Sequence, residues 1–347
     1  MLVGLPGSPD GLGASPDGRW SFASLQGPSG RIVVSSDRLF APRPVRTIPL
    51  PAAAASGLAV THDGRLLLAA VGRGAVVIDA SRASEAGSGA VLGRLMAPRS
   101  GAAAGGGGAE VAVSPDDRFA FVSLEGAGVI AVFDLGAAAT YRFRGGGFVG
   151  TIKLGISPLG LSVSPDGRLL YATSELAGGH AGRGHGSLTM IDLRRAETDP
   201  AHSVLAVAAV PCHPVRVAAS PDGRVVWVTA RTGNELLGFS LTSPLGRPRL
   251  ALAAVVPVGA QPIGLGVVDG GARVIVADSN LQGRRGPAAS LTVVDAAAAL
   301  RGQSAVLGTI RAGALPSEVA LAPNQSTLLV NNSASDQVEA VDVTRLP

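Results

Sequence analysis

The sequence has very little cysteine, lysine or aromatic residue. Cys212 is the only cysteine, Lys153 is the only lysine, and aromatic residues make up 3% of the chain. A single cysteine excludes an internal disulfide and a zinc site built from cysteines. Grooves that bind nucleic acid usually add stacking aromatic residues to their basic ones, so this composition argues against nucleic-acid binding. The few aromatics, such as Trp20, Tyr171 and Trp227, lie in apolar runs where core packing accounts for them.

Long hydrophobic runs and familiar catalytic motifs are also missing. No apolar stretch is long enough to span a bilayer. The first residues, Met1 to Pro6, have neither the basic n-region nor the apolar h-region of a signal peptide. There is no GxSxG, HExxH, CxxC or CxxCH, which excludes the usual serine hydrolase, zinc protease, thioredoxin and haem-attachment sites. An enzyme whose residues converge from distant parts of the chain is not excluded.

A short turn motif of the type Ser-Pro-Asp-Gly-Arg is what the sequence has in abundance. Pro presets φ, Asp bonds its own backbone, and Gly supplies the positive φ that closes a hairpin. We therefore expect a positive φ at Gly167, and little effect from replacing Asp117, which stands in the Gly position of its copy, by Asn. The copies are spaced by roughly 50 residues, the length of a propeller blade. Their first residues are Ser15, Thr61, Ser114, Ser164, Ser220, Val268 and Ala322.

Apolar runs surround each turn in a constant order. One run precedes the turn, a fuller run follows it, a third run ends in Asp, and a looser fourth run completes the unit. The third-run Asp can cap the turn that comes next. The middle runs are apolar at consecutive positions, so both faces of the corresponding strands must be covered.

This order predicts an all-β protein, a seven-bladed β-propeller of four-stranded antiparallel blades. Met1 to Leu5 should pair with the strand around Val338 to Asp342, so that the N-terminal strand completes the last blade and closes the ring. A start further upstream would fit this short strand equally well. We expect one domain over residues 1–347. Its predicted blades are residues 9–50, 51–96, 97–154, 155–210, 211–258, 259–311, and 312–347 plus 1–5.

The second strands carry a family resemblance. Leu170-Tyr171-Ala172-Thr173, Trp227-Val228-Thr229 and Leu329-Val330-Asn331-Asn332 each follow the turn motif. The strands after the first and the third of these end in Asp192 and Asp342, whereas Ser240 takes the place of the Asp after the second. In this combination the chain resembles the YVTN-repeat seven-bladed β-propellers along essentially its whole length. That superfamily is similar to seven-bladed lactonases and to non-catalytic propeller subunits of some redox enzymes. The resemblance implies a bacterial, extracytoplasmic protein, secreted or periplasmic, and it implies no cofactor.

Candidate binding residues lie on the face opposite the repeated turns, where the loops differ from blade to blade. A binding site needs unlike groups directed at one point, and loops on that face supply Arg, His, carboxylate and amide groups. These groups would suit a small polar or anionic ligand, or a protein partner. The alternative is that each is an ordinary solvated loop residue. The candidates are Glu175, His180, His185, His213, Arg231, Asn234, Asp278, Asn280, Asn331 and Asn332.

Neither a metal site nor a catalytic residue can be assigned from the sequence. His180 and His185 lie in one glycine-rich loop, but no third ligand is marked. Cys212 and His213 are adjacent, and adjacent side chains of an extended segment diverge, so they do not form a nucleophile and base.

Three functions fit these features. The first is a non-catalytic binding or scaffold propeller that acts through its loop face, which we expect to be a monomer. The second is a lactonase-like hydrolase acting on a sugar lactone, and the third is an accessory propeller subunit of a redox enzyme. A large exposed apolar patch would favour the subunit, and a deep pocket with a buried carboxylate would favour the enzyme.

Overall fold

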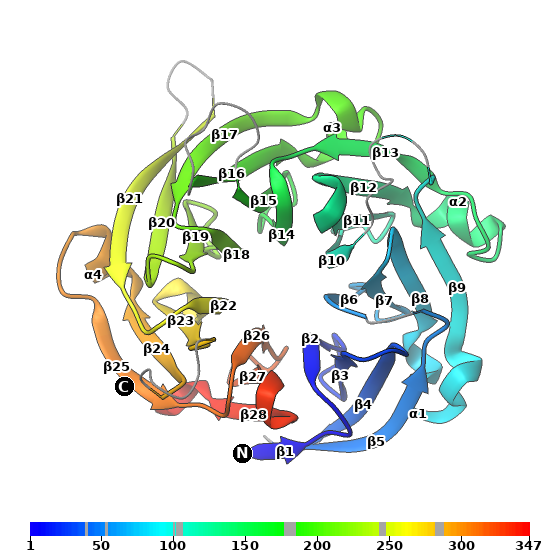
Figure 1. Ribbon diagram of the computed structural model, residues 1–347, viewed down its shortest axis with the longest axis horizontal. Helices are drawn as coiled ribbons and strands as arrows, with labels where there is room; N and C mark the ends of the chain where they lie inside the picture. The colour runs from blue at the N-terminus through cyan, green and yellow to red at the C-terminus, as the bar shows by residue number, and fades with distance from the viewer. Residues whose placement is uncertain are drawn as a thin grey trace.

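The computed structural model describes residues 1–38, 41–52, 55–99, 101, 107–176, 185–242, 248–281 and 288–347. It is a ring of seven four-stranded antiparallel sheets around a central channel (Figure 1). The predicted fold class, a seven-bladed β-propeller, is confirmed. Among the described residues no helix has the length and apolar character needed to cross a membrane.

Each blade runs from an inner strand at the channel to an outer strand at the rim. Blades 1 to 3 contain β2 (Pro9–Ala14), β3 (Trp20–Leu25), β4 (Arg31–Arg38), β5 (Ala41–Pro49); β6 (Leu58–Val60), β7 (Leu66–Val71), β8 (Gly74–Asp79), β9 (Val91–Met96); β10 (Gly108–Val113), β11 (Phe119–Leu124), β12 (Val129–Asp134) and β13 (Phe148–Lys153). Blades 4 to 6 contain β14 (Ile156–Val163), β15 (Leu169–Leu176), β16 (His185–Asp192), β17 (Val204–Pro211); β18 (Pro214–Ala219), β19 (Val225–Ala230), β20 (Glu235–Thr242), β21 (Arg249–Pro257); β22 (Pro262–Val268), β23 (Arg273–Asp278), β24 (Ser290–Asp295) and β25 (Val306–Arg311). Blade 7 contains β26 (Pro316–Leu321), β27 (Thr327–Asn332), β28 (Gln337–Asp342) and, from the other end of the chain, β1 (Leu2–Gly4).

The N-terminal strand closes the ring. In β1, Leu2 pairs with Glu339 and Val3 pairs with Val338 of β28. The Met1 ammonium also donates to the Ala340 carbonyl oxygen at 2.6 Å. The predicted closure is therefore confirmed, and it joins the first and last blades by backbone hydrogen bonds.

The repeated turns have the chemistry that their sequence predicts. The Ser164 hydroxyl donates to Asp166 Oδ1 at 2.6 Å, and the Arg168 backbone N–H donates to the same oxygen at 3.1 Å. Gly167 has a φ of +69°, as expected. Copies in blades 1, 2, 3 and 5 make the same pair of bonds, so one local structure is reused around the ring.

The Asp at the end of the third strand caps the segment that follows. The Asp134 carboxylate accepts the backbone N–H of Ala137 at the start of α2 (Leu135–Thr140). Asp192 does the same for α3 (Leu193–Ala196), and Asp295 for α4 (Ala296–Leu300). These short helices lie at the rim of the ring (Figure 1). They connect third strands to fourth strands, so in the antiparallel blades they lie at the same end as the repeated turns.

The hydrophobic core lies between successive blades. All six residues of β11, β19 and β27 are buried, as expected for strands that are apolar at consecutive positions. Tyr171 and Trp227 are among the largest fully buried side chains. This packing makes the blades rigid walls around the channel.

Candidate binding site in the central channel

One position near the start of each inner strand is Gly in four blades and charged in three. Gly11, Gly57, Gly160 and Gly264 occupy it in blades 1, 2, 4 and 6. A Cβ on Gly11 or Gly160 would overlap the backbone of the next inner strand, so Gly is needed there. Blades 3, 5 and 7 instead carry Glu110, Arg216 and Glu318. Three unlike charged side chains therefore replace glycines at one level of the channel.

Hydroxyl groups on the second strands fix the backbone at this level. Thr173 accepts the backbone N–H of Gly160 in its own blade at 3.0 Å and donates to the Val215 carbonyl of the next blade at 2.6 Å. Thr229 repeats this arrangement, with the Arg216 N–H at 3.0 Å and the Ile263 carbonyl at 2.9 Å. Ser24 and Ser123 make equivalent bonds in blades 1 and 3. The backbone at Arg216 is thus fixed by two hydroxyls. The Thr173 hydroxyl donates to the carbonyl of the preceding residue, Val215, and the Arg216 N–H donates to the Thr229 hydroxyl.

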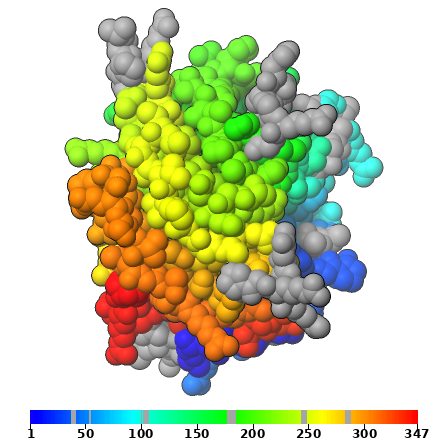
Figure 2. All heavy atoms as spheres, turned by 60° about the vertical axis from the view of Figure 1, so that its left-hand side comes forward, coloured from blue at the N-terminus to red at the C-terminus, as the bar shows by residue number. Residues whose placement is uncertain are grey.

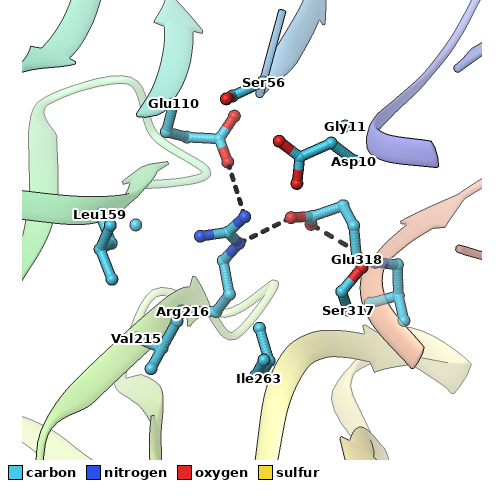
Figure 3. Close-up of polar contacts among 12 residues, drawn as sticks. Asp10, Gly11, Ser56, Glu110, Leu159, Val215, Arg216, Ile263, Ser317 and Glu318 are labelled. Atoms are coloured by element: carbon cyan, nitrogen blue, oxygen red, sulfur yellow. Dashed lines mark hydrogen bonds and ion pairs between the residues drawn. The ribbon is translucent and has the colours of Figure 1, made fainter. Parts of the chain in front are cut away.

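The three charged side chains meet across the channel (Figure 3). Arg216 Nε donates to Glu318 Oε2 at 2.6 Å, while its NH2 nitrogen lies 3.7 Å from Glu110 Oε2. The side chains are 13 to 16% exposed, so they are largely shielded from bulk water. The guanidinium has a short charge-assisted bond to Glu318 and only a longer electrostatic contact with Glu110.

Glu110 is the less well paired carboxylate. Its Oε1 accepts the Val111 backbone N–H at 3.1 Å, and it occupies the space that a Cβ on Gly57 would fill. Burial raises the pKa of Glu110 to about 8, with Arg216 acting in the opposite direction and Glu318 and Asp10 adding to the rise. Glu110 therefore holds a proton at neutral pH unless a further positive charge approaches.

Asp10 adds a fourth charged group. Its carboxylate lies on the blade 1 side of the channel, facing the triad (Figure 3). Burial works against the charge of Arg216, but Glu318 and Glu110 outweigh it and the pKa of Arg216 is raised. The guanidinium stays charged, and three carboxyl groups surround it.

A cavity of about 260 Å³ adjoins the triad. Apart from Glu110, Arg216 and Glu318, its described lining consists of Gly11, Leu12, Gly57, Leu58, Val111, Leu161, Val217, Leu265 and Val319. No His, Cys, Ser or Thr is among these lining residues. The cavity thus combines aliphatic walls with one charged patch, and its described lining contains no hydroxyl, thiol or imidazole group that could act as a nucleophile.

Two of the residues selected from sequence do come together at the loop face. The Arg231 guanidinium forms an ion pair with the Glu175 carboxylate. Glu175 Oε2 also lies 3.5 Å from the Ser157 hydroxyl, which donates to Glu125 Oε1 at 3.0 Å. This chain of contacts links blades 3, 4 and 5. The Arg231 guanidinium is paired with a carboxylate of the protein itself.

Three other selected residues are buried inside the blades. Asp278 Oδ2 accepts the hydroxyls of Ser290 at 2.8 Å and Thr292 at 2.6 Å, and burial raises the pKa of Asp278. Asn331 and Asn332 are also buried. The expected position of all three on the open loop face is corrected, because a side chain at the end of a second strand is covered by the adjoining strands.

The two asparagines bond to protein groups. Asn331 donates its side-chain amide to the Asp10 carbonyl at 2.6 Å, which ties blade 7 to blade 1. Asn332 donates to Glu339 Oε2 at 3.3 Å. Asn331 takes the place of the second-strand hydroxyls in other blades.

The remaining selected residues do not gather at one point. His213 Nδ1 lies 3.0 Å from the Thr232 hydroxyl, and Asn234 Oδ1 accepts the Gln261 backbone N–H at 2.8 Å. Asn280 has a φ of +45°, and its backbone N–H donates to the Ala260 carbonyl.

Of the two histidines selected from the glycine-rich loop, only His185 lies within the described residues. His185 is exposed at the start of β16, whereas His180 lies outside the described residues. Within the described part of the chain, no group of three or more His, Cys, Asp or Glu residues is arranged to hold a metal ion.

Sequence reasoning missed Glu110, Arg216 and Glu318. The available signal was an exception to the repeat, since Pro-x-Gly opens the inner strands at Pro9, Pro158 and Pro262 but becomes Pro-Val-Arg and Pro-Ser-Glu at Pro214 and Pro316. A charged residue at a position that elsewhere needs Gly points to a local function rather than to the common fold.

Comparison with known proteins shows the fold and nothing finer. No family model matches the sequence, and no curated protein matches it significantly. Among solved structures, hydrazine synthase of Kuenenia stuttgartiensis superposes with a TM-score of 0.73 at 19% identity, covering 99% of this chain and 97% of that one. The β-propeller domain of Myceliophteria thermophila Cps50 (Swd1) gives a TM-score of 0.69 at 11% identity, covering 98% and 97%.

Proposed function

We propose that this protein is a non-catalytic binding propeller that receives a positively charged group, on a small polar ligand or a partner protein, at its central channel. The observation that carries this proposal is the excess of carboxyl groups over Arg216 beside a cavity of about 260 Å³. With Glu110 protonated, the carboxylates of Glu318 and Asp10 leave the site one negative charge in excess of the single guanidinium, and a second appears when Glu110 loses its proton. A protonated amine or guanidinium complements that surplus.

Because Arg216 is already paired with Glu318, the site favours a cationic ligand over an anionic one. An anionic ligand would have to compete with Glu318, which already holds Arg216 Nε at 2.6 Å, and would face three carboxyl groups. A cation would instead bind near Glu110, whose contact with Arg216 is 3.7 Å long. This reverses the preference for an anionic ligand that the loop residues suggested.

A lactonase-like hydrolase is the second candidate. Glu110 has a pKa of about 8, which suits a general acid or base at neutral pH, and Arg216 could stabilise negative charge next to it. The described cavity lining offers no hydroxyl, thiol or imidazole nucleophile, so such an enzyme would use a carboxylate, either to activate water or to attack the lactone directly. Membership of the YVTN-repeat family and an extracytoplasmic location belong to the same proposal and rest on the sequence resemblance.

A thermal-shift and calorimetric screen tests the binding proposal. Spermidine and arginine amide are the cationic probes, and phosphate and gluconate are the anionic ones. We expect the cations to raise the melting temperature, because a ligand that binds only the native state stabilises it. Binding at neutral pH should also release a proton from Glu110.

Glu318→Gln is the site variant, and Glu85→Gln, which is exposed at the rim of the ring, is the matched control. Cation binding should weaken at least several-fold in the first and stay unchanged in the second. Stabilisation by the anions alone would overturn the proposal. Hydrolysis of gluconolactone that disappears in Glu110→Gln would select the hydrolase instead.

A further inference from the structure

The channel has a second ordered layer next to the charged one. In every blade, the residue that follows the Gly or charged position of the inner strand is aliphatic. These residues are Leu12, Leu58, Val111, Leu161, Val217, Leu265 and Val319, one from each blade. All of them line the cavity of about 260 Å³ together with Glu110, Arg216 and Glu318. We call this layer the aliphatic ring.

Packing between the blades holds the aliphatic ring in place. Each member packs in or against a different hydrophobic cluster of the core. A Cβ on Gly13 would lie 3.6 Å from Leu58, and a Cβ on Gly266 would lie 3.2 Å from Val319, so small residues of the preceding blade leave room for these side chains. Blades 5 and 6, in yellow and orange, also lie against each other along the outer surface of the molecule (Figure 2). The ring is therefore a preformed apolar wall of the cavity.

The two layers have a fixed order along the channel. Each inner strand runs from the loop face to its repeated turn, as β10 runs from Gly108 to the turn that begins at Ser114. Glu110 therefore lies nearer to the loop face than Val111, by one strand residue or about 3.3 Å. A ligand that contacts both layers has its charged end toward the loop face and its other end toward the turn face.

The aliphatic ring restricts what the positive charge can be attached to. Apart from Glu110, Arg216 and Glu318, no described residue of the cavity lining has a polar side chain. A second charged or hydroxyl group of the ligand would lose water among these side chains and gain no side-chain partner, which is unfavourable. A hydrocarbon group in the same place leaves water for an apolar surface, which is favourable.

We propose that the ligand of the channel is a small amphipathic monoamine, that is, an ammonium group on a short hydrocarbon stem. The ammonium group binds beside the carboxyl groups of Glu110 and Glu318, and the stem packs in the aliphatic ring. This inference rests on the proposed function and narrows the ligand from any cation to one chemical class. The cavity of about 260 Å³ is smaller than the pockets of about 300 to 1,000 Å³ that hold drug-sized ligands, so the stem is short.

A lysine side chain of a partner protein has the same groups in the opposite order. Its ammonium is at the free end of the stem, so a partner on the loop face would place the ammonium in the aliphatic ring and the stem beside the carboxyl groups. The order of Glu110 before Val111, and of Glu318 before Val319, therefore favours a free amine.

Calorimetric titration of the full chain with n-alkylammonium ions, from ethylammonium to octylammonium, tests the inference. Each methylene that the ring buries should raise the affinity about three- to four-fold until the cavity is full, and the affinity should then stop rising. Diamines with the same number of carbon atoms are the matched ligands. They should show no such gain, because their second ammonium would enter the ring. Nα-acetyl-lysine amide should bind no more tightly than ethylammonium.

Leu161→Ala is the ring variant. Leu154→Ala, which packs against the same hydrophobic cluster from the end of the outer strand β13, is the matched control. We expect Leu161→Ala to shift the highest affinity to a longer alkylammonium ion, because it enlarges the cavity, and Leu154→Ala to leave the preferred length unchanged. Ethylammonium should bind both variants as it binds the natural protein. An equal shift in the two variants, or a shift in neither, would show that the stem does not lie in the ring.

The inference and the proposed function fail in different ways. If spermidine, arginine amide and all the alkylammonium ions fail to bind, the cation site itself is wrong. If spermidine or arginine amide binds but affinity does not rise with alkyl length, or rises equally for the diamines, only the amphipathic ligand is excluded. Binding of Nα-acetyl-lysine amide as tightly as pentylammonium would overturn the assignment to a free amine. The measurements on the natural protein decide these points even if a variant does not fold.

Discussion

On the turn face, five aspartates hold the same position in their repeats and make the same bonds. In the channel, the carboxylates of Glu110 and Glu318 each occur in one blade only, and both interact with Arg216. Asp166 and Asp222 each accept one hydroxyl and one backbone N–H. Glu110 and Glu318 converge on the single Arg216 from distant blades. The repeated turns stabilise the fold in the same way in each blade. The channel combines unlike groups at one point, which selective binding requires.

The pKa values of these groups separate the two regions. The Ser164 hydroxyl, with the Arg168 backbone N–H, holds the pKa of Asp166 below its usual range, because hydrogen bonds favour the ionised form. Burial raises the pKa of Glu110 to about 8, since its partners do not replace the lost water. A carboxyl group that serves structure is thus kept charged, and the one in the channel is kept ready to exchange a proton.

Removing the channel cation is the change expected to have the largest effect. Arg216→Ala leaves Glu318 and Glu110 without their partner in a largely buried site, which should cost about 3 to 5 kcal/mol of unfolding free energy. Urea denaturation measures the loss. Arg231→Ala, which breaks the more exposed pair with Glu175 on the loop face, is the comparison and should cost clearly less. Equal losses would remove the distinction between channel and loop.

A glycine of the repeated turn comes next. Gly167→Val must hold a β-branched residue at φ +69°, which should cost about 1 to 3 kcal/mol. A Cβ there would also lie 2.7 Å from Pro115 of the preceding blade. Gly223→Val is the matched control, because it has a φ of +70° and open space around it. The excess for Gly167 over Gly223 measures the contact between blades; no excess would mean that the turns do not touch in solution.

One pair of turns breaks the uniformity of the turn face. Gly64, Gly167 and Gly271 each approach the Pro of the preceding turn, but between blades 2 and 3 His62 replaces Pro and Asp117 replaces Gly. Asp117 accepts the backbone N–H groups of His62 and Asp63, both at 2.8 Å, and lies 2.8 Å from His62 Nδ1. The expected tolerance of Asp117→Asn is therefore revised, and we now expect a loss of about 1 kcal/mol.

A double-mutant cycle checks this substitution of one contact for another. His62→Pro and Asp117→Gly should each destabilise, whereas the double variant restores the Pro–Gly contact of the other blades and should recover about 1 kcal/mol of coupling. Thermal unfolding of the four proteins gives the coupling. If the stability losses of the two single variants simply add in the double variant, then His62 and Asp117 do not replace the Pro–Gly contact as a pair.

The pH dependence of stability distinguishes the two regions by its direction. The folded pKa of Glu110 lies above its unfolded value, so its contribution is fully present below the unfolded pKa and is lost as pH rises through about 8. The turn aspartates have lowered pKa values, and their contribution is lost as pH falls through the acid range. Glu110→Gln should flatten the fall in melting temperature between about pH 4.5 and pH 8, and Ser164→Ala should flatten the fall at acid pH. If Glu110→Gln changed only the acid part of the profile and Ser164→Ala only the part at higher pH, the assignment of a raised pKa to Glu110 and a lowered pKa to Asp166 would be wrong.

The sequence by itself determined the number of blades, the turn chemistry and the closing strand. These features come from short segments such as Ser164 to Arg168, whose bonds lie within five residues and are repeated along the chain. A hydrogen-bonding pattern that lies within a few residues and recurs along the chain can be predicted from the sequence without knowing the fold. The capping by Asp134, Asp192 and Asp295 was predictable for the same reason.

Only the tertiary structure decided which side chains share a site. Arg216 and Glu318 are 102 residues apart, and they meet because the ring brings inner strands of different blades to one level. The same closure buries Asp278, Asn331 and Asn332. Whether a polar residue at a strand end faces a ligand or a neighbouring strand depends on the packing of separate blades, and no local pattern in the chain encodes that packing.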